Sequence, residues 1–437
     1  MNKKVPVVSV ARTPEADQLA NLPLEASFAL AEVADAMREG LLAFASATGL
    51  VVMRQMMETE LAERIGPKHA KIAEGRTGHW HGTTKGPVVL GGRLVTVERP
   101  RARTTRGEEI TLDSWKVFSS ADLLNALVVE RMLAGVATRR HQDVAEPVGT
   151  EIDKRSRSTS KSAVSRRFVA ATEKALADLM ARNLAGLDVA VLMIDGLEVA
   201  GQCCVVALVI TAEGLKVPVG LWLGDTENKT VVTSLLADLV SRGLGFEQGI
   251  LCVIDGAKAL AAGIKKVFGE SARLQRCTIH KRRNLSDHLP KDLARTIDAR
   301  LRVIFAQPDP TKGLEAAKRL AAELEADHPD AAASLREGLE EMFTARRIGV
   351  TVSLAKNLTN TNCIESMISV ARRTTGRVTR WKDGSMKKRW IAAGMLEAER
   401  SFRRIKGYTA MPKFVEALRR EIASSAVTPV NYDHQAA

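Results

Sequence analysis

The sequence predicts an α/β core flanked by helical segments. Between residues 188 and 276, apolar runs of strand length alternate with stretches of helical period. Long segments rich in Ala, Leu, Glu and Arg flank this region. Apolar residues make up 45% of the 437 residues, which is enough for a normal core. Because only 4% of the residues are aromatic, aliphatic side chains must fill that core.

The central region is predicted to hold five strands and two helices. Short apolar runs predict the strands at residues 189–194, 203–211, 215–223, 250–254 and 272–276. Amphipathic spacing predicts helices at 230–242 and 257–268, on either side of the fourth strand. Three meandering strands followed by helix, strand, helix and strand is the element order of an RNase H-like core. Residues 281–347 are predicted to be helical throughout, and a second helical block begins at residue 359.

The N-terminal third is predicted to be mostly helical, with one small hairpin. Apolar residues recur at three- and four-residue spacing over residues 24–61. Residues 87–90 and 93–97 are predicted to be two strands joined at Gly91-Gly92. Four arginines follow, and they are either a solvated edge or part of a nucleic-acid-binding surface: Arg99, Arg101, Arg103 and Arg106.

Two further helices indicate a DNA-binding region. One is predicted from Ser120-Ala121-Asp122 to Leu133, and the other from Ser160 or Ser162 to about residue 183. The first turns of the second helix resemble the recognition helix of a helix-turn-helix, with Lys161, Ser165, Arg166 and Arg167. The spacer between the two helices is longer than the usual short turn. The alternative is an ordinary surface helix that carries basic residues.

Charge and cysteine content limit the class of protein. The net charge of +13 and a pI of about 9.6 favour a polyanionic partner, which would be bound through counterion release. Five cysteines without a CxxC motif favour reduced thiols in a cytosol over a disulfide framework. Residues 1–18 lack the apolar region of a signal peptide. No apolar stretch reaches the ~20 residues of a membrane helix.

Three acidic residues predict a metal-dependent site. Asp195 follows the first strand, Asp255 follows the fourth, and a glycine follows each. A single Asp-Gly is weak evidence, because turns are built from it. Two Asp-Gly pairs on adjacent strands would place both aspartate carboxylates at one rim of the sheet. Glu365 would then come from a helix that Asn360 and Asn362 can cap, although a glutamate near a helix start is also stabilised without any function.

Three carboxylates at one rim suit Mg²⁺, with Mn²⁺ as a substitute. Paired ions of this kind clamp the attacking and leaving oxygens in phosphoryl transfer. A strongly basic segment follows Glu365, either as a solvated face or as a phosphate-binding track: Arg372, Arg373, Arg377, Arg380, Lys382, Lys387, Lys388 and Arg389. Trp381 and Trp390 interleave with it. They could stack on unpaired bases, although Trp390 is expected in the core.

Cys277 and His280 form a C-x2-H element. It could be half of a zinc site, but no second Cys/His pair lies at ligand spacing. The preferred interpretation places His280 at the end of the fifth strand, near the metals, where it contacts the scissile phosphate or a nearby base. A buried structural histidine is the alternative.

These motifs together resemble the IS256-type transposases of the Mutator superfamily, which are DDE transposases of bacterial insertion sequences. The matching segments are Ile194-Asp195-Gly196-Leu197, residues 253–260, residues 275–284 and Asn362-Cys363-Ile364-Glu365-Ser366. The resemblance covers roughly residues 120–408. It implies that Asp195, Asp255 and Glu365 are the DDE triad, and that the helical segment after residue 280 is an insertion in the catalytic core. Related enzymes often stack a flipped base on an insertion tryptophan. Here no tryptophan lies between Asp255 and Glu365, and Phe305 and Phe343 are the only aromatic residues of the predicted insertion, so the sequence does not favour a base-flipping role.

The expected protein is an α/β RNase H-like catalytic core with an all-helical insertion, preceded by a mostly helical N-terminal DNA-binding region. The expected domains are residues 1–118 (helical with a hairpin), 119–186 (helix-turn-helix-like), 187–280 (first part of the core), 281–350 (insertion), 351–425 (C-terminal part of the core) and 426–437 (tail).

The expected activity is cleavage and strand transfer at the terminal inverted repeats of the insertion sequence. The expected partner is double-stranded DNA, bound by a homodimer or larger assembly in the bacterial cytoplasm, at the nucleoid. The alternatives are a DNA-binding regulator or inactive relic, and a structure-specific nuclease.

Overall fold

The structure is a computed structural model. It describes residues 40–68, 77–90, 93–120, 122–138, 148–157, 160–226 and 228–426, together with residues 33 and 140. The chain divides into two compact units, Met1–Ala171 and Thr172–Ala437. The division falls inside one helix, α6 (Lys161–Met180).

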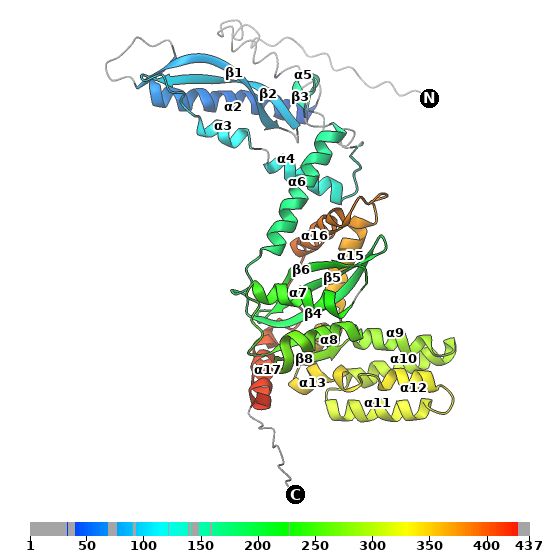
Figure 1. Cartoon of the computed structure of the whole chain (residues 1–437). Coiled ribbons are helices and arrows are strands. Elements are labelled where there is room, and N and C mark those ends of the chain that lie inside the picture. Colours follow the sequence, from blue (N-terminus) through cyan, green and yellow to red (C-terminus); the bar gives the residue numbers. More distant parts are fainter. Residues whose placement is uncertain are drawn as a thin grey trace, which may run out of the picture. The chain divides into compact units, whose positions relative to one another are not determined.

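The N-terminal unit is built around a long hairpin (Figure 1). Strands β1 (Gly78–Leu90) and β2 (Arg93–Thr104) pair antiparallel, and the short β3 (Ser156–Arg157) pairs with the start of β2. The hairpin was predicted, but it is longer than expected. Its Gly91-Gly92 tip lies outside the described residues.

Helices cover this hairpin. Helix α2 (Leu41–Ile65) buries Met57 and Leu61 against the strands, and α3 (Asp113–Phe118) places Trp115 over Gly86, where a Cβ atom would lie 2.5 Å from the ring. The predicted helix over residues 24–61 is therefore found from Leu41 onward, and most of its earlier part lies outside the described residues.

The two helices that suggested a helix-turn-helix are present as α4 (Asp122–Leu133) and α6. Ser160 caps α6, since its Oγ accepts a hydrogen bond from the Ala163 amide at 3.4 Å. Helix α5 (Thr150–Arg155) and strand β3 lie between α4 and α6 in the chain, and β3 is paired with the hairpin. The connection therefore contains a helix and a paired strand, and it is not the short turn of a helix-turn-helix.

The second unit contains a five-stranded mixed sheet in the order β6-β5-β4-β7-β8. Strands β4 (Val189–Val199), β5 (Gln202–Thr211) and β6 (Lys216–Gly224) are antiparallel to one another. Strands β7 (Ile250–Ile254) and β8 (Ala272–Arg276) are parallel to β4. All five strands lie where the apolar runs predict them.

One strand differs in length from the prediction. Strand β4 continues five residues past Ile194, because β5 pairs with it as far as Val199. Ala200 and Gly201 close this hairpin with φ angles of 48° and 74°, the left-handed pair that a tight two-residue turn requires. Asp195 therefore lies within β4 and not at its end.

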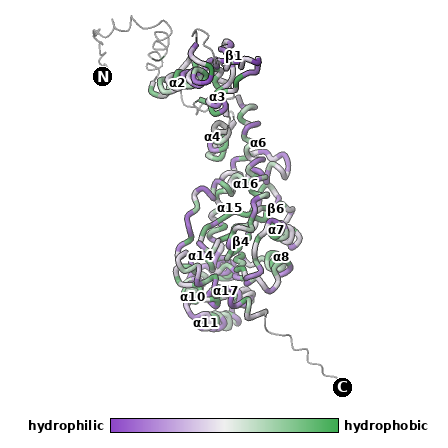
Figure 2. Tube along the Cα trace, turned by 90° about the vertical axis from the view of Figure 1, so that its left-hand side faces the viewer, coloured by the Kyte–Doolittle hydropathy of each residue, from purple (hydrophilic) through white to green (hydrophobic). Residues whose placement is uncertain are grey.

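Helices cover both faces of the sheet (Figure 1). Successive residues of a strand point to opposite faces. Leu192 and Ile194 pack with α7 (Lys229–Ser241) and α8 (Lys258–Phe268). Val191 and Met193 pack on the other face with α14 (Val352–Leu358), α15 (Asn362–Thr375), α16 (Gly384–Arg400) and α17 (Met411–Ala426). In Figure 2 the label β4 marks this sheet region on the Cα trace.

A block of helices follows β8. It consists of α9 (Thr278–Asp287), α10 (Lys291–Ala306), α11 (Pro310–Leu324), α12 (Pro329–Arg336) and α13 (Thr344–Ile348), with a 3-10 turn at Glu340–Met342. The predicted helical character of residues 281–347 is confirmed. Buried Gln275 of β8 fixes the end of the block, since it donates to the Met342 carbonyl and accepts from the Ala345 amide, both at 2.9 Å.

No helix in the described part of the chain is both long enough and apolar enough to cross a membrane.

Candidate carboxylate site

Two aspartates lie at equivalent positions, Asp195 within β4 and Asp255 directly after the adjacent parallel strand β7. Met193 of β4 pairs with Val253 of β7, and Asp195 and Asp255 each come two residues later. Asp195 alternates in phase with Met193 and Leu197, both of which pack on the side of the sheet that α15 covers. Asp195 therefore lies on the sheet face that α15, the helix of Glu365, covers, and the carboxylates of Asp255 and Glu365 are close enough to repel its negative charge.

Backbone contacts hold both aspartates. Asp195 Oδ1 accepts from the Gly196 amide at 2.8 Å, and Asp255 Oδ1 accepts from the Ala257 amide at 2.9 Å, just before α8 begins. Gly256, which lies between Asp255 and Ala257, has a φ of 113°, a backbone conformation that favours glycine. Both hydrogen bonds are accepted by Oδ1, so they leave Oδ2 of each aspartate for another contact.

Glu365 lies in the first turn of α15, and the preceding residues orient it. Asn360 Oδ1 accepts from the Asn362 amide at 3.1 Å, so Asn360 supports the start of the helix as predicted. Asn362 is itself the first helical residue and not a cap. Buried Thr361 donates from Oγ1 to Glu365 Oε1 at 2.6 Å.

The start of α9 joins this site. The Cys277 amide donates to the Ile254 carbonyl at 2.8 Å, and the Thr278 amide donates to the Thr359 carbonyl at 3.0 Å. Cys277 is the N-cap of α9, and His280 lies in the first turn of that helix rather than at the end of the fifth strand. These two hydrogen bonds connect the end of β7, and the residues before α15, to the start of α9.

His280 faces the glutamate. Its Nδ1 lies 3.3 Å from Thr361 Oγ1 and 3.8 Å from Glu365 Oε1. Cys277 Sγ is also 3.3 Å from Thr361 Oγ1. Sequence reasoning did not find Thr361, the residue that touches all three. The only signal for it is the polar run Thr359-Asn360-Thr361-Asn362 in front of the helix.

The charges of these groups are coupled. Burial, followed by repulsion from Asp255, raises the pKa of Asp195 to about 6. A hydrogen bond with Cys277 and the nearby carboxylates raise the pKa of His280, although burial opposes the rise. Burial would raise the pKa of the Cys277 thiol, but hydrogen bonds with His280 and Thr361 outweigh it and lower that pKa.

Divalent cations fit this chemistry. The mutual repulsion of the Asp195 and Asp255 carboxylates is the kind of stress that a bound cation relieves, and carboxylate oxygens are the donors that Mg²⁺ and Mn²⁺ prefer. A second donor set overlaps it. One ligand atom from each of Cys277, His280 and Glu365 lies within 4.8 Å of the others.

The basic residues that follow Glu365 include both exposed and buried side chains. Arg372, Arg373, Arg377 and Arg380 have exposed side chains. Two other members are structural. Buried Lys387 donates to the Ala200 carbonyl at 3.0 Å and to Gln202 Oε1 at 2.9 Å, and buried Arg389 donates to Thr172 Oγ1 at 2.9 Å. The phosphate-binding interpretation is therefore wrong for Lys387 and Arg389.

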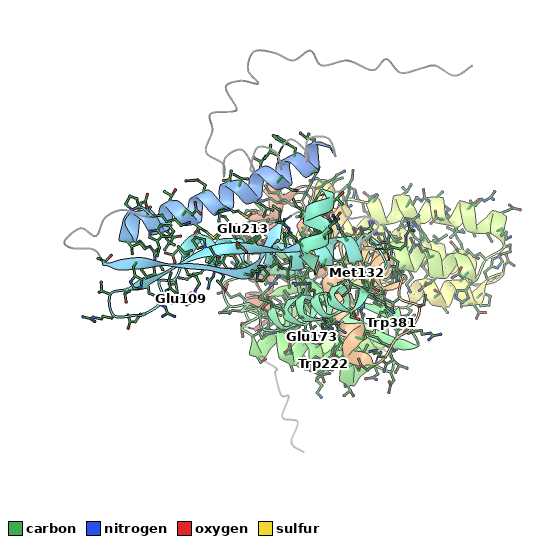
Figure 3. All side chains as sticks on the ribbon, turned by 90° about the horizontal axis from the view of Figure 1, so that it is seen from above. Glu109, Met132, Glu173, Glu213, Trp222 and Trp381 are labelled. Atoms are coloured by element: carbon green, nitrogen blue, oxygen red, sulfur yellow. The ribbon has the colours of Figure 1, made fainter. Side chains whose placement is uncertain are left out.

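The aromatic residues are mostly engaged in packing. Trp390 is buried, as expected, and Trp381, labelled in Figure 3, packs against the core on the α15 side. Phe305 and Phe343 are buried in the helical block with their ring centroids 5.7 Å apart. Stacking on unpaired bases is thus not favoured for Trp390, Phe305 or Phe343.

The basic first turns of α6 are mainly on the surface. Lys161, Ser165 and Arg166 are exposed, whereas Arg167 is only partly exposed, and burial together with Arg166 lowers its pKa. In the hairpin, Arg101 pairs with Glu109 at 2.8 Å, and Arg99 lies over the Trp115 ring, 5.0 Å from its centroid. Lys161 and Arg166 of α6 are therefore more exposed than these two arginines of the hairpin.

A mixed α/β sheet, a cluster of coupled carboxylates beside it and a strong positive charge define the class of protein: a basic α/β protein with a candidate metal site. The sequence model of the family described as "Transposase, Mutator family" matches residues 26–404, and the chain belongs to this family. The resemblance inferred from the motifs is thus confirmed.

Curated relatives agree with the family. The transposase for insertion sequence element IS256 in transposon Tn4001 of Staphylococcus aureus is 26% identical over 357 residues, which cover 79% of this chain and 87% of the relative. The transposase for insertion sequence element ISRM5 of Rhizobium meliloti is 25% identical over 330 residues, or 74% of this chain and 80% of the relative. The transposase for IS6120 of Mycolicibacterium smegmatis is 28% identical over 201 residues, or 45% and 61%.

Proposed function

We propose that this chain is a transposase that binds the terminal inverted repeats of its own insertion sequence and catalyses metal-dependent DNA cleavage and strand transfer. The main observation behind the proposal is that Asp195 within β4 and Asp255 directly after β7 lie at the same level of two parallel strands, with Glu365 electrostatically coupled to Asp195. Family membership and relatives that are named insertion-sequence transposases support it.

The sheet supports an RNase H-like assignment for the core. Three antiparallel strands are followed by two strands parallel to the first, in the order β6-β5-β4-β7-β8, as expected for that fold. The helical block then lies between the last strand and the helix of Glu365, where the resemblance places an insertion.

In this proposal Asp195, Asp255 and Glu365 hold Mg²⁺, with Mn²⁺ as a substitute. When bound, the ions would polarise the scissile phosphate and lower the pKa of an attacking water. Asp195 and Asp255 contribute the oxygens that their backbone contacts leave open. Thr361 fixes the orientation of Glu365. His280 donates a hydrogen bond to a phosphate oxygen as negative charge develops there.

One site can serve both chemical steps. Cleavage by water frees a 3′-OH, and that hydroxyl then attacks a phosphate of the target DNA. Both steps are displacements at phosphorus, so no covalent bond to the protein is needed. Exposed Lys161, Ser165 and Arg166, with Arg167 beside them, would contact the terminal repeats. Arg372, Arg373, Arg377 and Arg380 would hold DNA near the carboxylates.

Bringing two transposon ends together requires at least a dimer on DNA, and the expected place of action is the bacterial nucleoid. The alternative is a regulator or inactive relic that binds ends without cutting. The presence of all three acidic residues, with Asp195 coupled to both partners, favours the enzyme.

The test is incubation of the full-length chain with DNA carrying the ends of its element in Mg²⁺ or Mn²⁺. The proposal predicts strand-specific nicks at the ends, and no such nicks in DNA with scrambled ends. Tight end binding without any nicking in either metal would instead support the regulator.

A further inference from the structure

A set of sulfur, nitrogen and oxygen donors shares Glu365 with the carboxylate site. Cys277 contributes a sulfur from the N-cap of α9, His280 an imidazole nitrogen from its first turn, and Glu365 a carboxylate oxygen from the first turn of α15. These ligand atoms lie within 4.8 Å of one another, and His280 Nδ1 is 3.8 Å from Glu365 Oε1. In a tetrahedral zinc site, neighbouring ligand atoms are about 3.3–3.7 Å apart, given the usual zinc–ligand bond lengths.

The donor chemistry differs from that of a magnesium site. Mg²⁺ takes oxygen ligands and does not select thiolate sulfur, whereas Zn²⁺ binds cysteine, histidine and carboxylate together. Three protein ligands with a fourth position open is the arrangement of zinc sites that keep a water or a substrate group. No second Cys/His pair is needed for such a site, because Glu365 supplies the third ligand.

We propose that Cys277, His280 and Glu365 bind one Zn²⁺, and that this ion inhibits the enzyme by withdrawing Glu365 from the magnesium-binding carboxylates. The binding site stands on the geometry alone. The inhibition rests on the proposed function, because it assumes that Glu365 is needed for Mg²⁺-dependent cleavage.

The three donors are held close together by the protein itself. Thr361 Oγ1 lies 3.3 Å from Cys277 Sγ, 3.3 Å from His280 Nδ1 and 2.6 Å from Glu365 Oε1. A hydroxyl has a single proton to donate, and the shortest contact assigns it to Glu365. A cation would satisfy all three ligand atoms at once. Backbone hydrogen bonds at Cys277 and Thr278 fix the start of α9, the helix that supplies two of the three donors.

The site has a route of entry. Cys277 is fully buried, but the side chains of His280 and Glu365 are 26% and 29% exposed. An ion would therefore arrive from the side of the histidine and the glutamate, and the thiolate would complete its coordination from the interior.

Cobalt titration of the reduced, metal-free, full-length chain tests the binding site. Co²⁺ substitutes for Zn²⁺, and a bound thiolate gives a charge-transfer band in the near ultraviolet. The expected result is one Co²⁺ per chain with this band, and its displacement by one equivalent of Zn²⁺. The band should be lost in Cys277→Ser and weakened in His280→Ala. Thermal melting should show that both variants remain folded.

A matched control separates Cys277 from the other thiols. Cys363 is also buried and lies two residues before Glu365, but it is outside the donor set. Cys363→Ser should keep the wild-type cobalt spectrum, and so should Asp195→Ala. Absence of the band in the wild type, or a band that survives in folded Cys277→Ser, would overturn the zinc site and leave a hydrogen-bonded cluster.

Inhibition is measured separately, by adding Zn²⁺ to cleavage reactions at saturating Mg²⁺. Cys277→Ser should need at least ~10-fold more Zn²⁺ than the wild type to halve its own zinc-free rate. Equal sensitivity of the two proteins would refute the inhibitory role. A wild-type chain that shows the cobalt band but never cleaves end DNA would count against the proposed function and not against the metal site.

Discussion

Asp195 and Asp255 lie at the same level of two parallel strands, each two residues beyond the pair Met193–Val253. The strands differ in one respect: β7 ends before its aspartate, whereas β4 continues against β5. Asp195 is therefore a carboxylate inside a strand, partly buried and next to a second negative charge. Burial and Asp255 together raise its pKa to about 6.

This raised pKa predicts how metal-free stability depends on pH. The unfolded pKa of an aspartate is about 3.9, so folding favours the protonated form of Asp195. Its contribution to stability is fully present below about pH 4 and is lost as the pH rises through about 6. Asp195→Asn, which cannot ionise, should therefore gain stability over the wild type at pH 8, by at most about 3 kcal/mol, and much less at pH 4.5.

Urea unfolding without metal at the two pH values measures this difference. Asp178→Asn is a suitable control, because Asp178 is an exposed residue of α6 that pairs with Lys174. The same gain for Asp195→Asn at both pH values would contradict a raised pKa for Asp195.

Replacing His280 should impair catalysis more than folding. Loss of a preorganised donor to a developing oxyanion typically costs about 10²–10³ in rate, so His280→Ala should cleave end DNA that much more slowly. Cys277→Ser should be milder in zinc-free buffer, because serine can still cap α9. Cleavage rates measured beside thermal melting test both variants. A His280→Ala protein that simply unfolds would leave only a structural role for this histidine.

Thr361 is predicted to be a positioning residue for Glu365 and His280. Thr361→Val keeps the shape of the side chain but loses the hydroxyl, so kcat should fall by roughly 10-fold while KM for end DNA changes little. Thr361→Ser should restore most of the rate. Should the valine and serine variants behave alike, the hydroxyl contacts would not be responsible.

The first turns of α6 should carry part of the end-binding charge. A Lys161→Ala/Arg166→Ala double variant should bind end DNA more weakly and reduce the salt slope by about 2. Lys174→Ala is the matched control, since Lys174 lies on the same helix but pairs with Asp178. Gel shifts over a range of salt with end and scrambled DNA measure both effects. An unchanged slope would remove this helix from the interface, and equal losses on both DNAs would indicate backbone contact alone.

The strands were predictable because each is an apolar run bounded by turn residues, and burial on both faces produces that pattern. The extension of β4 was not predictable in the same way. Asp195-Gly196 resembles a turn, and only pairing with β5 keeps those residues in a strand. Local sequence is a weak guide wherever a distant partner decides the conformation.

Two further features were not predicted from the sequence, and for different reasons. Thr361 contacts residues 81 and 84 positions away, and nothing in its local sequence names those partners. Lys387 looks like part of a charged surface run. Its spacing to Trp390, Ile391 and Gly394 nevertheless places it on the buried face of α16. Helical periodicity could have identified the buried position of Lys387, whereas the polar run in front of α15 does not single out Thr361.

The most direct test of the carboxylate site compares wild type with Asp195→Ala, Asp255→Ala and Glu365→Ala on DNA carrying the element's ends in Mg²⁺. The account predicts that each variant binds the ends as the wild type does but yields no strand-specific cleavage and no strand transfer. Near-normal cleavage by any one of the three variants would contradict the assignment of that residue.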